Sequence, residues 1–159
     1  MISHDYLGTN NLGRSFIYGA TPLSTLALIV QVCGLNPKDT IFDLGCGPGR
    51  TTFFLHCFVG SRTIGIDIIP EFIENASVIV DKLKYEELFF LQGDFREINY
   101  HDADVIYMYG STFDNVLVAE LLDKFRKEVI VGTKIITITK SLSDYCAASD
   151  FEVIEEFPA

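Results

Sequence analysis

The amino-acid sequence predicts an α/β fold, in which a doubly wound, mostly parallel sheet lies between two layers of helices. Three observations indicate this class. Short apolar runs typical of buried strands alternate with segments of helical spacing, as in consecutive βαβ units. A glycine-rich turn joins the strand-like run at 40–44 to a helical segment that starts near residue 50. Polar residues follow most of the strand-like runs, at the end where such sheets bind ligands. We therefore expect one three-layer α/β/α domain spanning residues 1–159.

The N-terminal half is expected to begin with an irregular segment at residues 1–20. A helix follows and runs to about Cys33, because Pro22 suits a first helical turn, Thr21 suits its cap and Gly34 suits its end. The elements after it are a strand at 40–44, a helix at 51–58, a strand at 63–67 and a helix at 70–83.

The C-terminal half continues the alternation. Strands are expected at 88–92, 103–108 and 134–139, with a helix at 115–127, a turn at Gly132 and a sixth strand at 151–157. Each connection crosses over the sheet, and right-handed crossovers make the sheet doubly wound. No sequence remains for a seventh, antiparallel strand, so either this is a truncated version or one sheet edge stays open. Because an open edge favours pairing with a second copy, we expect a homodimer through it.

The composition is typical of a globular chain. Of its 159 residues, 48% are hydrophobic and 21% are charged, which supports a sizeable core rather than disorder. The net charge of −10 argues against strong nucleic-acid affinity, since phosphate contacts need clusters of Lys and Arg. The same charge suits a cationic protein partner as well as simple solubility.

The sequence carries no membrane, secretion or metal signal. Its apolar runs are too short to span a membrane, and residues 1–5 lack the basic-then-apolar layout of a signal peptide. The four cysteines form no C-x-x-C pair, and the three histidines have no ligand spacing. We therefore expect reduced thiols, a cytoplasmic location and no bound metal.

The segment Asp43-Leu44-Gly45-Cys46-Gly47-Pro48-Gly49 carries the clearest functional signal. Its alternating glycines permit positive φ angles and let backbone N–H groups come close to a ligand. A dinucleotide-binding loop would have its third glycine where this chain has Arg50. A structural strand–turn–helix corner is the alternative. Asp43 would orient the loop N–H groups or meet a ligand ammonium; otherwise it is a buried structural carboxylate.

Acidic residues also follow the next two strands. Asp67 ends the strand at 63–67, where a carboxylate can accept both hydroxyls of a ribose; otherwise it stabilises the N-terminus of the helix at 70–83. Asp94 follows the third strand. Together with Phe95 it would hold an adenine, the carboxylate accepting the exocyclic amine and the ring lying against the base. The alternative is a turn aspartate followed by a core aromatic residue.

Several segments resemble known enzymes. The cofactor motifs of the class I, seven-β-strand, S-adenosylmethionine (SAM) dependent methyltransferases, which have a Rossmann-like fold, are similar to Phe42–Gly49, Gly65–Asp67 and Gly93–Phe95. The non-SET histone-lysine methyltransferases and their small archaeal and bacterial protein-lysine relatives are similar at Tyr18–Pro22, Ala103–Tyr109, Gly132–Ile136 and Thr139–Ser141.

This resemblance implies SAM as the methyl donor, S-adenosylhomocysteine (SAH) as the product and a protein lysine as the acceptor. An aromatic channel would favour the neutral amine, although the free lysine pKa is about 10.4. Tyr109, Gly110 and Ser111 would line that channel, and Tyr18 and Thr21 would close over the methionine end of SAM. The other cofactor contacts it implies are Asp43, Gly45, Cys46, Gly47, Gly49, Asp67, Ile68, Asp94 and Phe95.

The chain departs from the histone enzymes after the fourth strand, where their Asn pair is replaced by Tyr109-Gly110. Two other functions therefore stay open. One is a small-molecule methyltransferase, which a lid inserted between strands would favour. The other is a module that binds SAM or a nucleotide without catalysis.

Overall fold

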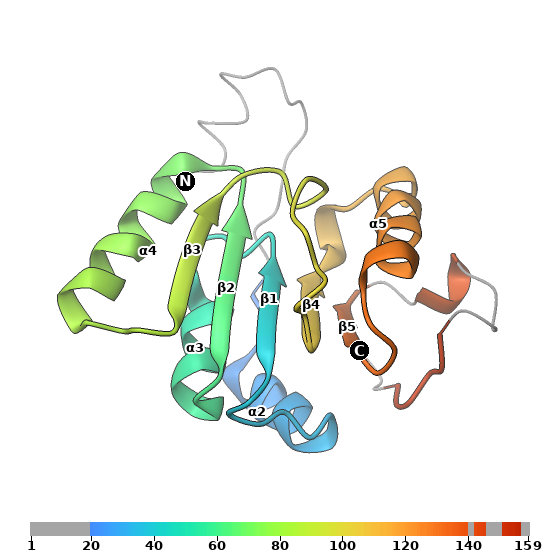
Figure 1. Cartoon of the computed structure of the whole chain (residues 1–159), viewed down its shortest axis with the longest axis horizontal. Coiled ribbons are helices and arrows are strands. Elements are labelled where there is room, and N and C mark those ends of the chain that lie inside the picture. Colours follow the sequence, from blue (N-terminus) through green and yellow to red (C-terminus); the bar gives the residue numbers. More distant parts are fainter. Residues whose placement is uncertain (1–19, 140–141, 146–150, 157–159) are drawn as a thin grey trace.

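The computed structural model describes residues 20–139, 142–145 and 151–156. Its sheet has the strand order β3-β2-β1-β4-β5, and every neighbouring pair is parallel (Figure 1). This arrangement confirms the doubly wound α/β prediction. The strands are β1 Thr40–Leu44, β2 Arg62–Asp67, β3 Leu88–Gln92, β4 Val105–Tyr109 and β5 Lys134–Ile138.

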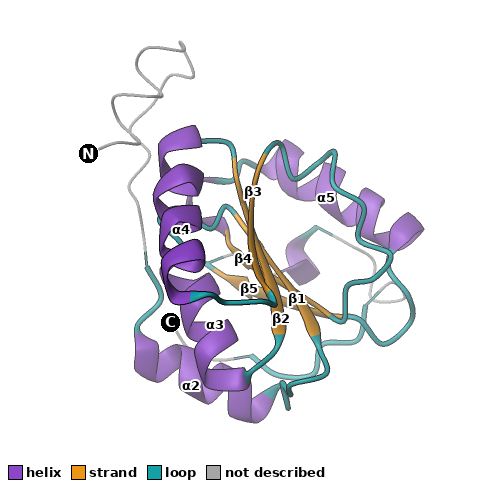
Figure 2. Ribbon diagram, turned by 60° about the vertical axis from the view of Figure 1, so that its left-hand side comes forward, coloured by secondary structure: helices purple, strands orange, loops and turns teal. Residues whose placement is uncertain are grey.

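Helices cover both faces of the sheet and complete the predicted three layers (Figure 2). Three of them, α2, α3 and α4, lie on one face, and α5 lies on the other. No helix of the described residues is long and apolar enough to cross a bilayer. The helices are α2 Leu23–Val32, α3 Arg50–Val59, α4 Pro70–Leu83 and α5 Asn115–Glu128, with single 3₁₀ turns η1 Gly110–Thr112 and η2 Leu142–Asp144.

Each face of the sheet has its own hydrophobic core. On the α5 side, the buried ring of Tyr100 packs edge-on against Phe42 of β1 and Phe125 of α5, with 5.4 Å between ring centroids in both pairs. On the other side, Leu26 of α2 and Leu55 of α3 are buried against β1 and β4. Both faces are covered over the central strands β1, β2 and β4, which are buried along most of their length, so polar side chains concentrate at their ends.

The predicted helices and strands up to residue 139 agree with the structure to within two residues at each end. The largest difference is at β4, which begins at Val105 and not at Ala103. The Ala103 N–H closes a turn on the Tyr100 carbonyl (3.0 Å). The Asp104 carboxylate then accepts a hydrogen bond from the N–H of Thr40, the first residue of β1 (2.8 Å), so regular strand pairing starts only at the next residue.

Two predictions about local structure are wrong. Thr21 does not cap α2, because Pro22 occupies the N-cap position and no side chain caps that helix start. The strand expected at 151–157 is also not formed, since the described residues 151–156 have no regular secondary structure. Phe151 packs against the α5-side core, whereas Val153 and Ile154 are exposed. An apolar pattern becomes a strand only where a neighbouring strand pairs with it.

Candidate functional site

The carboxyl ends of β1 and β4 mark the point where the strand order reverses. β1 pairs with β2 on one side and β4 on the other, and the chain reaches β4 only after β3. Open α/β sheets bind their ligands at such a point. Most of the predicted cofactor residues lie at the carboxyl ends of β1, β2 and β3 or directly after them, and the predicted acceptor residues lie at the end of β4 or directly after it. The topology therefore brings both groups to one edge of the sheet (Figure 1).

The loop after β1 contains three left-handed residues. Gly45, Gly47 and Gly49 have φ angles of +72°, +55° and +85°, as the glycine spacing predicts. The N–H groups of Gly45 and Cys46 both donate to the carbonyl of Ile66 on β2 (2.9 and 3.0 Å). Burial raises the pKa of the Cys46 thiol. The loop is thus folded over the end of β2, and the Cys46 side chain is turned inward.

Asp67 connects this loop to β2. Its Oδ2 accepts a hydrogen bond from the Gly47 N–H (2.8 Å), and its Oδ1 accepts one from the Ile69 N–H (3.0 Å). Only 8% of the residue is exposed. Burial raises the pKa of Asp67, and the backbone N–H groups partly offset that rise. Ile69 is the N-cap residue of α4, so the carboxylate serves the glycine loop and the helix start together.

Asp43 lies beneath the loop, at the end of β1, and holds the start of α3. Its Oδ2 accepts a hydrogen bond from the Thr52 hydroxyl (2.6 Å). The N-cap residue of α3 is Gly49, which has no side chain to cap the helix. Asp43 also accepts the backbone N–H of Thr52 in the first turn of α3, so it caps this helix from another element. Burial raises the pKa of Asp43 to about 7, with the Thr52 hydrogen bonds opposing the rise and the Asp67 charge adding to it.

Asp94 and Phe95 follow β3, as predicted, and each has a partner that sequence reasoning missed. The Asp94 carboxylate pairs with the guanidinium of Arg96, which lowers the pKa of Asp94. The Phe95 ring lies 5.3 Å, centroid to centroid, from that of Phe113. A Cβ added at Gly45 would stand 3.8 Å from the Phe113 ring, so this aromatic pair lies beside the glycine loop. The sequence shows Arg96 two positions after Asp94, a spacing that allows this ion pair. Phe113 belongs to no motif, so no local pattern predicts its contact with Phe95.

The remaining predicted residues fall in different surroundings. Tyr109 ends β4 half-buried, packed on the α2–α3 side of the sheet. Gly110 and Ser111 form the η1 turn directly after it. Ile68 follows Asp67 and is 46% exposed, so its side chain is accessible at this edge. Thr21 is buried and bonded to Tyr107, whereas Tyr18 lies outside the described residues.

The described residues contain no group of three or more His, Cys, Asp or Glu side chains that could hold a metal ion. The polar side chains at the strand ends are instead carboxylates that already accept N–H and O–H hydrogen bonds. Such groups suit ligands with hydroxyl and amine donors.

Comparison with known proteins gives a family match over most of the chain. Residues 35–159 match the family described as a methyltransferase domain. The histone-lysine N-methyltransferase, H3 lysine-79 specific, of Dictyostelium discoideum is 24% identical over 137 residues, which cover 77% of this chain and 7% of that protein. A protein-lysine N-methyltransferase of Saccharolobus islandicus is 26% identical over 122 residues, 76% of this chain and 74% of that protein. Shorter stretches match RNA methyltransferases and a trans-aconitate 2-methyltransferase.

Solved structures share the fold. An RNA methyltransferase from Salinibacter ruber, crystallised with SAH, superposes with a TM-score of 0.66 at 23% identity, over 75% of this chain and 76% of that one. This superposition supports the predicted Rossmann-like fold as well as the predicted parallel sheet.

Proposed function

We propose that this chain, which belongs to the methyltransferase domain family, transfers a methyl group from SAM to a lysine side chain of a protein. The coarser part of this function, SAM-dependent methyl transfer, rests on the family match and on the glycine loop at the sheet edge. The choice of a protein lysine as the acceptor is more specific, and separate observations support it.

The cofactor assignment rests on the hydrogen bonds that the Asp67 carboxylate already accepts and on the acceptor capacity that they leave. An ionised carboxylate has about four acceptor positions on its two oxygens. The Gly47 and Ile69 N–H groups use one position on each oxygen. The Ile68 N–H also bonds this carboxylate, so about one acceptor position is left, which can take a hydroxyl of a ribose. The residues present therefore fit the cofactor, and Asp67 would hold its sugar while keeping the glycine loop in place.

The neighbouring residues fit the other parts of the cofactor. Ile68 offers an exposed apolar side chain next to Asp67, and Asp94 with Phe95 follows the adjacent strand. When bound, SAM supplies an electrophilic methyl group on its sulfonium. The task of the chain is then to hold the acceptor in line with that group and to exclude water. Tyr109, which ends β4, and Ser111, which follows it at the same edge, would line the path of the acceptor.

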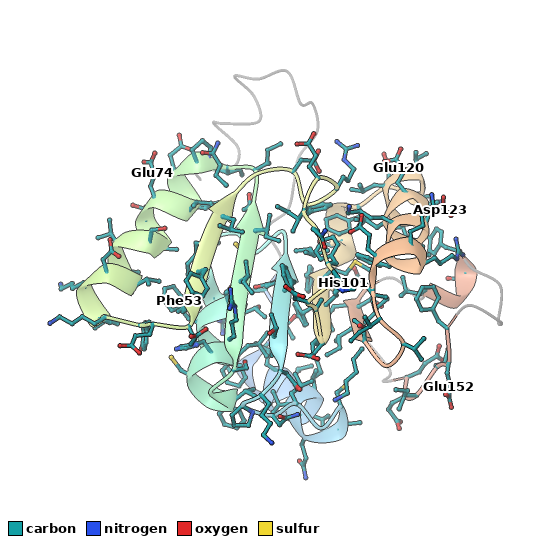
Figure 3. All side chains as sticks on the ribbon, viewed as in Figure 1. Phe53, Glu74, His101, Glu120, Asp123 and Glu152 are labelled. Atoms are coloured by element: carbon teal, nitrogen blue, oxygen red, sulfur yellow. The ribbon has the colours of Figure 1, made fainter. Side chains whose placement is uncertain are left out.

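Three observations support a protein lysine as the acceptor. Curated relatives that match 76–79% of this chain carry the names of lysine methyltransferases. The connection from β4 to α5 spans only residues 110–114, so no lid is inserted there to enclose a small substrate. The chain also carries a net charge of −10, and Glu74 stands at the rim on this edge (Figure 3). A rim of this charge attracts a lysine-rich segment.

Calorimetric titration of the full chain with SAM and SAH tests the donor. Asp67→Asn should weaken binding of both by at least tenfold, because the amide loses charge and half of its acceptor capacity. Asp81→Asn, on the exposed end of α4, is the matched control and should leave binding unchanged. Equal affinity of the wild type and Asp67→Asn would contradict the ribose assignment.

Incubation of the chain with isotopically labelled SAM and a lysine-rich protein tests the acceptor. We expect label on lysine, located by mass spectrometry of the digested product. Label found in RNA or on a small carboxylic acid instead would support another acceptor. Tight SAM binding without any transfer would support a non-catalytic module.

A further inference from the structure

Two neighbouring threonines hold the first turn of α3 to the two central strands of the sheet. The Thr52 hydroxyl donates to Asp43 on β1 (2.6 Å), and the Thr51 side chain bonds the hydroxyl of Tyr107 on β4. Asp43 and Tyr107 are partners in the register of the two strands. Because α3 begins at Arg50, directly after the glycine loop, these two bonds fix the end of that loop to the sheet.

The Tyr107 hydroxyl has a second partner from a distant part of the chain. It lies 2.5 Å from the hydroxyl of Thr21, which stands two residues before α2. Thr21 is 2% exposed and Tyr107 is 1% exposed, so water does not compete for this contact. Burial raises the pKa of Tyr107, which keeps the phenol neutral. A neutral hydroxyl donates one hydrogen bond and accepts others, so it can bond Thr21 and Thr51 at once.

The order of the strands relates Tyr107 to the cofactor. Asp67, which would hold the ribose, ends β2, and Tyr109, which would line the acceptor path, ends β4. β1 lies between these two strands. In SAM the methyl-bearing sulfur joins the sugar to the amino-acid end, so delivery of the methyl group toward β4 places that end over β1 and β4. Tyr107 stands two residues before Tyr109 and packs on the same side of the sheet. It therefore lies directly below the strand end that faces this part of the cofactor.

We propose that Tyr107 is a positioning residue for the amino-acid end of SAM, which acts by holding Thr21 and the first turn of α3 in fixed places. This inference rests on the proposed function and extends it to a residue buried below the site. Tyr107 does not touch the cofactor. Its hydroxyl joins the segment before α2 to the helix that follows the glycine loop, so these two segments keep one arrangement relative to each other. A phenylalanine at this position would keep the ring in the core and lose both links.

Calorimetry of the full chain with two ligands tests this role. SAH contains the amino-acid end, whereas 5′-methylthioadenosine keeps the adenine, the ribose and the sulfur but lacks that end. The wild type should bind SAH more tightly. Tyr107→Phe should lower the affinity for SAH by about five- to tenfold, which corresponds to one hydrogen bond, and should leave the affinity for 5′-methylthioadenosine within about twofold. Thr21→Val should show the same selective loss, because it removes the same link.

Tyr85→Phe is the matched control. The Cys57 thiol donates to the Tyr85 hydroxyl (3.4 Å) in an exposed place. Tyr85 precedes β3, so it lies near the amino ends of the parallel strands, opposite the glycine loop. Removal of this hydroxyl should leave both affinities unchanged. Far-ultraviolet circular dichroism of each variant checks that it is folded at the temperature of the titration.

Two results would overturn the inference. One is an unchanged affinity of Tyr107→Phe for SAH. The other is an equal loss of affinity for SAH and for 5′-methylthioadenosine, which a general disturbance of the fold or of the ribose contacts would produce. Failure of the proposed function looks different, because the wild type would then bind neither ligand.

Discussion

The hydroxyl groups of Thr21 and Tyr107 lie 2.5 Å apart, although 86 positions separate them in the sequence. Both residues are buried. The Tyr107 hydroxyl also bonds the Thr51 side chain in the first turn of α3. One phenol on β4 therefore links the segment before α2, the central sheet and the helix that follows the glycine loop. The position predicted to close over the methionine end of SAM is attached to the sheet by this contact.

Tyr107→Phe should lower the free energy of unfolding by about 1–3 kcal/mol, because it leaves the buried Thr21 hydroxyl without its partner. Urea denaturation measures the change. Thr21→Val in the same background should recover part of the loss, since both polar groups are then gone. Tyr145→Phe is the control: the Tyr145 hydroxyl bonds Asn115 (2.9 Å) in an exposed place, and its loss should stay within about 0.5 kcal/mol. Equal losses at both tyrosines would contradict the prediction.

Asp43 should make the protein less stable as the pH rises from about 4 to about 7. Its folded pKa is raised from 3.8 to about 7, so over this range the folded chain binds a proton that the unfolded chain has released. The contribution is fully present below the unfolded pKa and is lost as the pH passes through the folded pKa. Between pH 5 and 7 the slope from this group approaches about 1.4 kcal/mol per pH unit.

Asp43→Asn removes this titration and keeps an oxygen that can accept the Thr52 hydroxyl. The difference in unfolding free energy between Asp43→Asn and the wild type should therefore shift in favour of the variant as the pH increases from 5 to 7. Denaturation curves at four or five pH values measure it. Parallel stability curves for the two proteins would show that Asp43 does not titrate in this range.

Gly49→Ala should be strongly destabilising, because two effects coincide there. The residue has a φ angle of +85°, and an added Cβ would stand 2.6 Å from the Phe90 ring. Gly34→Ala separates them, since Gly34 has a φ angle of +59° with no atom within 4 Å of the added Cβ. We expect about 1–2 kcal/mol at Gly34, the strain of a left-handed alanine, and clearly more at Gly49. Thermal denaturation measures both losses of stability. Similar losses in Gly49→Ala and Gly34→Ala would mean that the Phe90 ring moves away from the added Cβ at little cost.

Self-association should occur through a sheet edge. Within the described residues β5 pairs only with β4, and an unpaired strand edge favours pairing with a second copy. Light scattering coupled to gel filtration should give a mass that rises toward that of a dimer as the loading concentration increases. A monomer mass at every concentration would argue against this pairing.

The local sequence determined most of the fold and the position of the candidate site. Glycine spacing after β1 requires left-handed residues, and apolar runs of strand length between helical segments require a covered parallel sheet. Both are properties of near neighbours in the chain. Asp67 could be placed at the site for the same reason, because the carboxyl end of a parallel strand always faces that edge.

Only the tertiary structure decided how the side chains at that edge are engaged. The position of Thr21 before Pro22 suits a helix cap, but its side chain bonds Tyr107 instead. Asp43 caps a helix from a neighbouring element. Phe113, which belongs to no motif, lies beside Gly45. The segment 151–156 has the pattern of a strand and forms none. The physical reason is shared: a hydrogen bond or a strand pairing needs a partner at the correct distance, and that partner comes from a part of the chain that the local pattern does not contain.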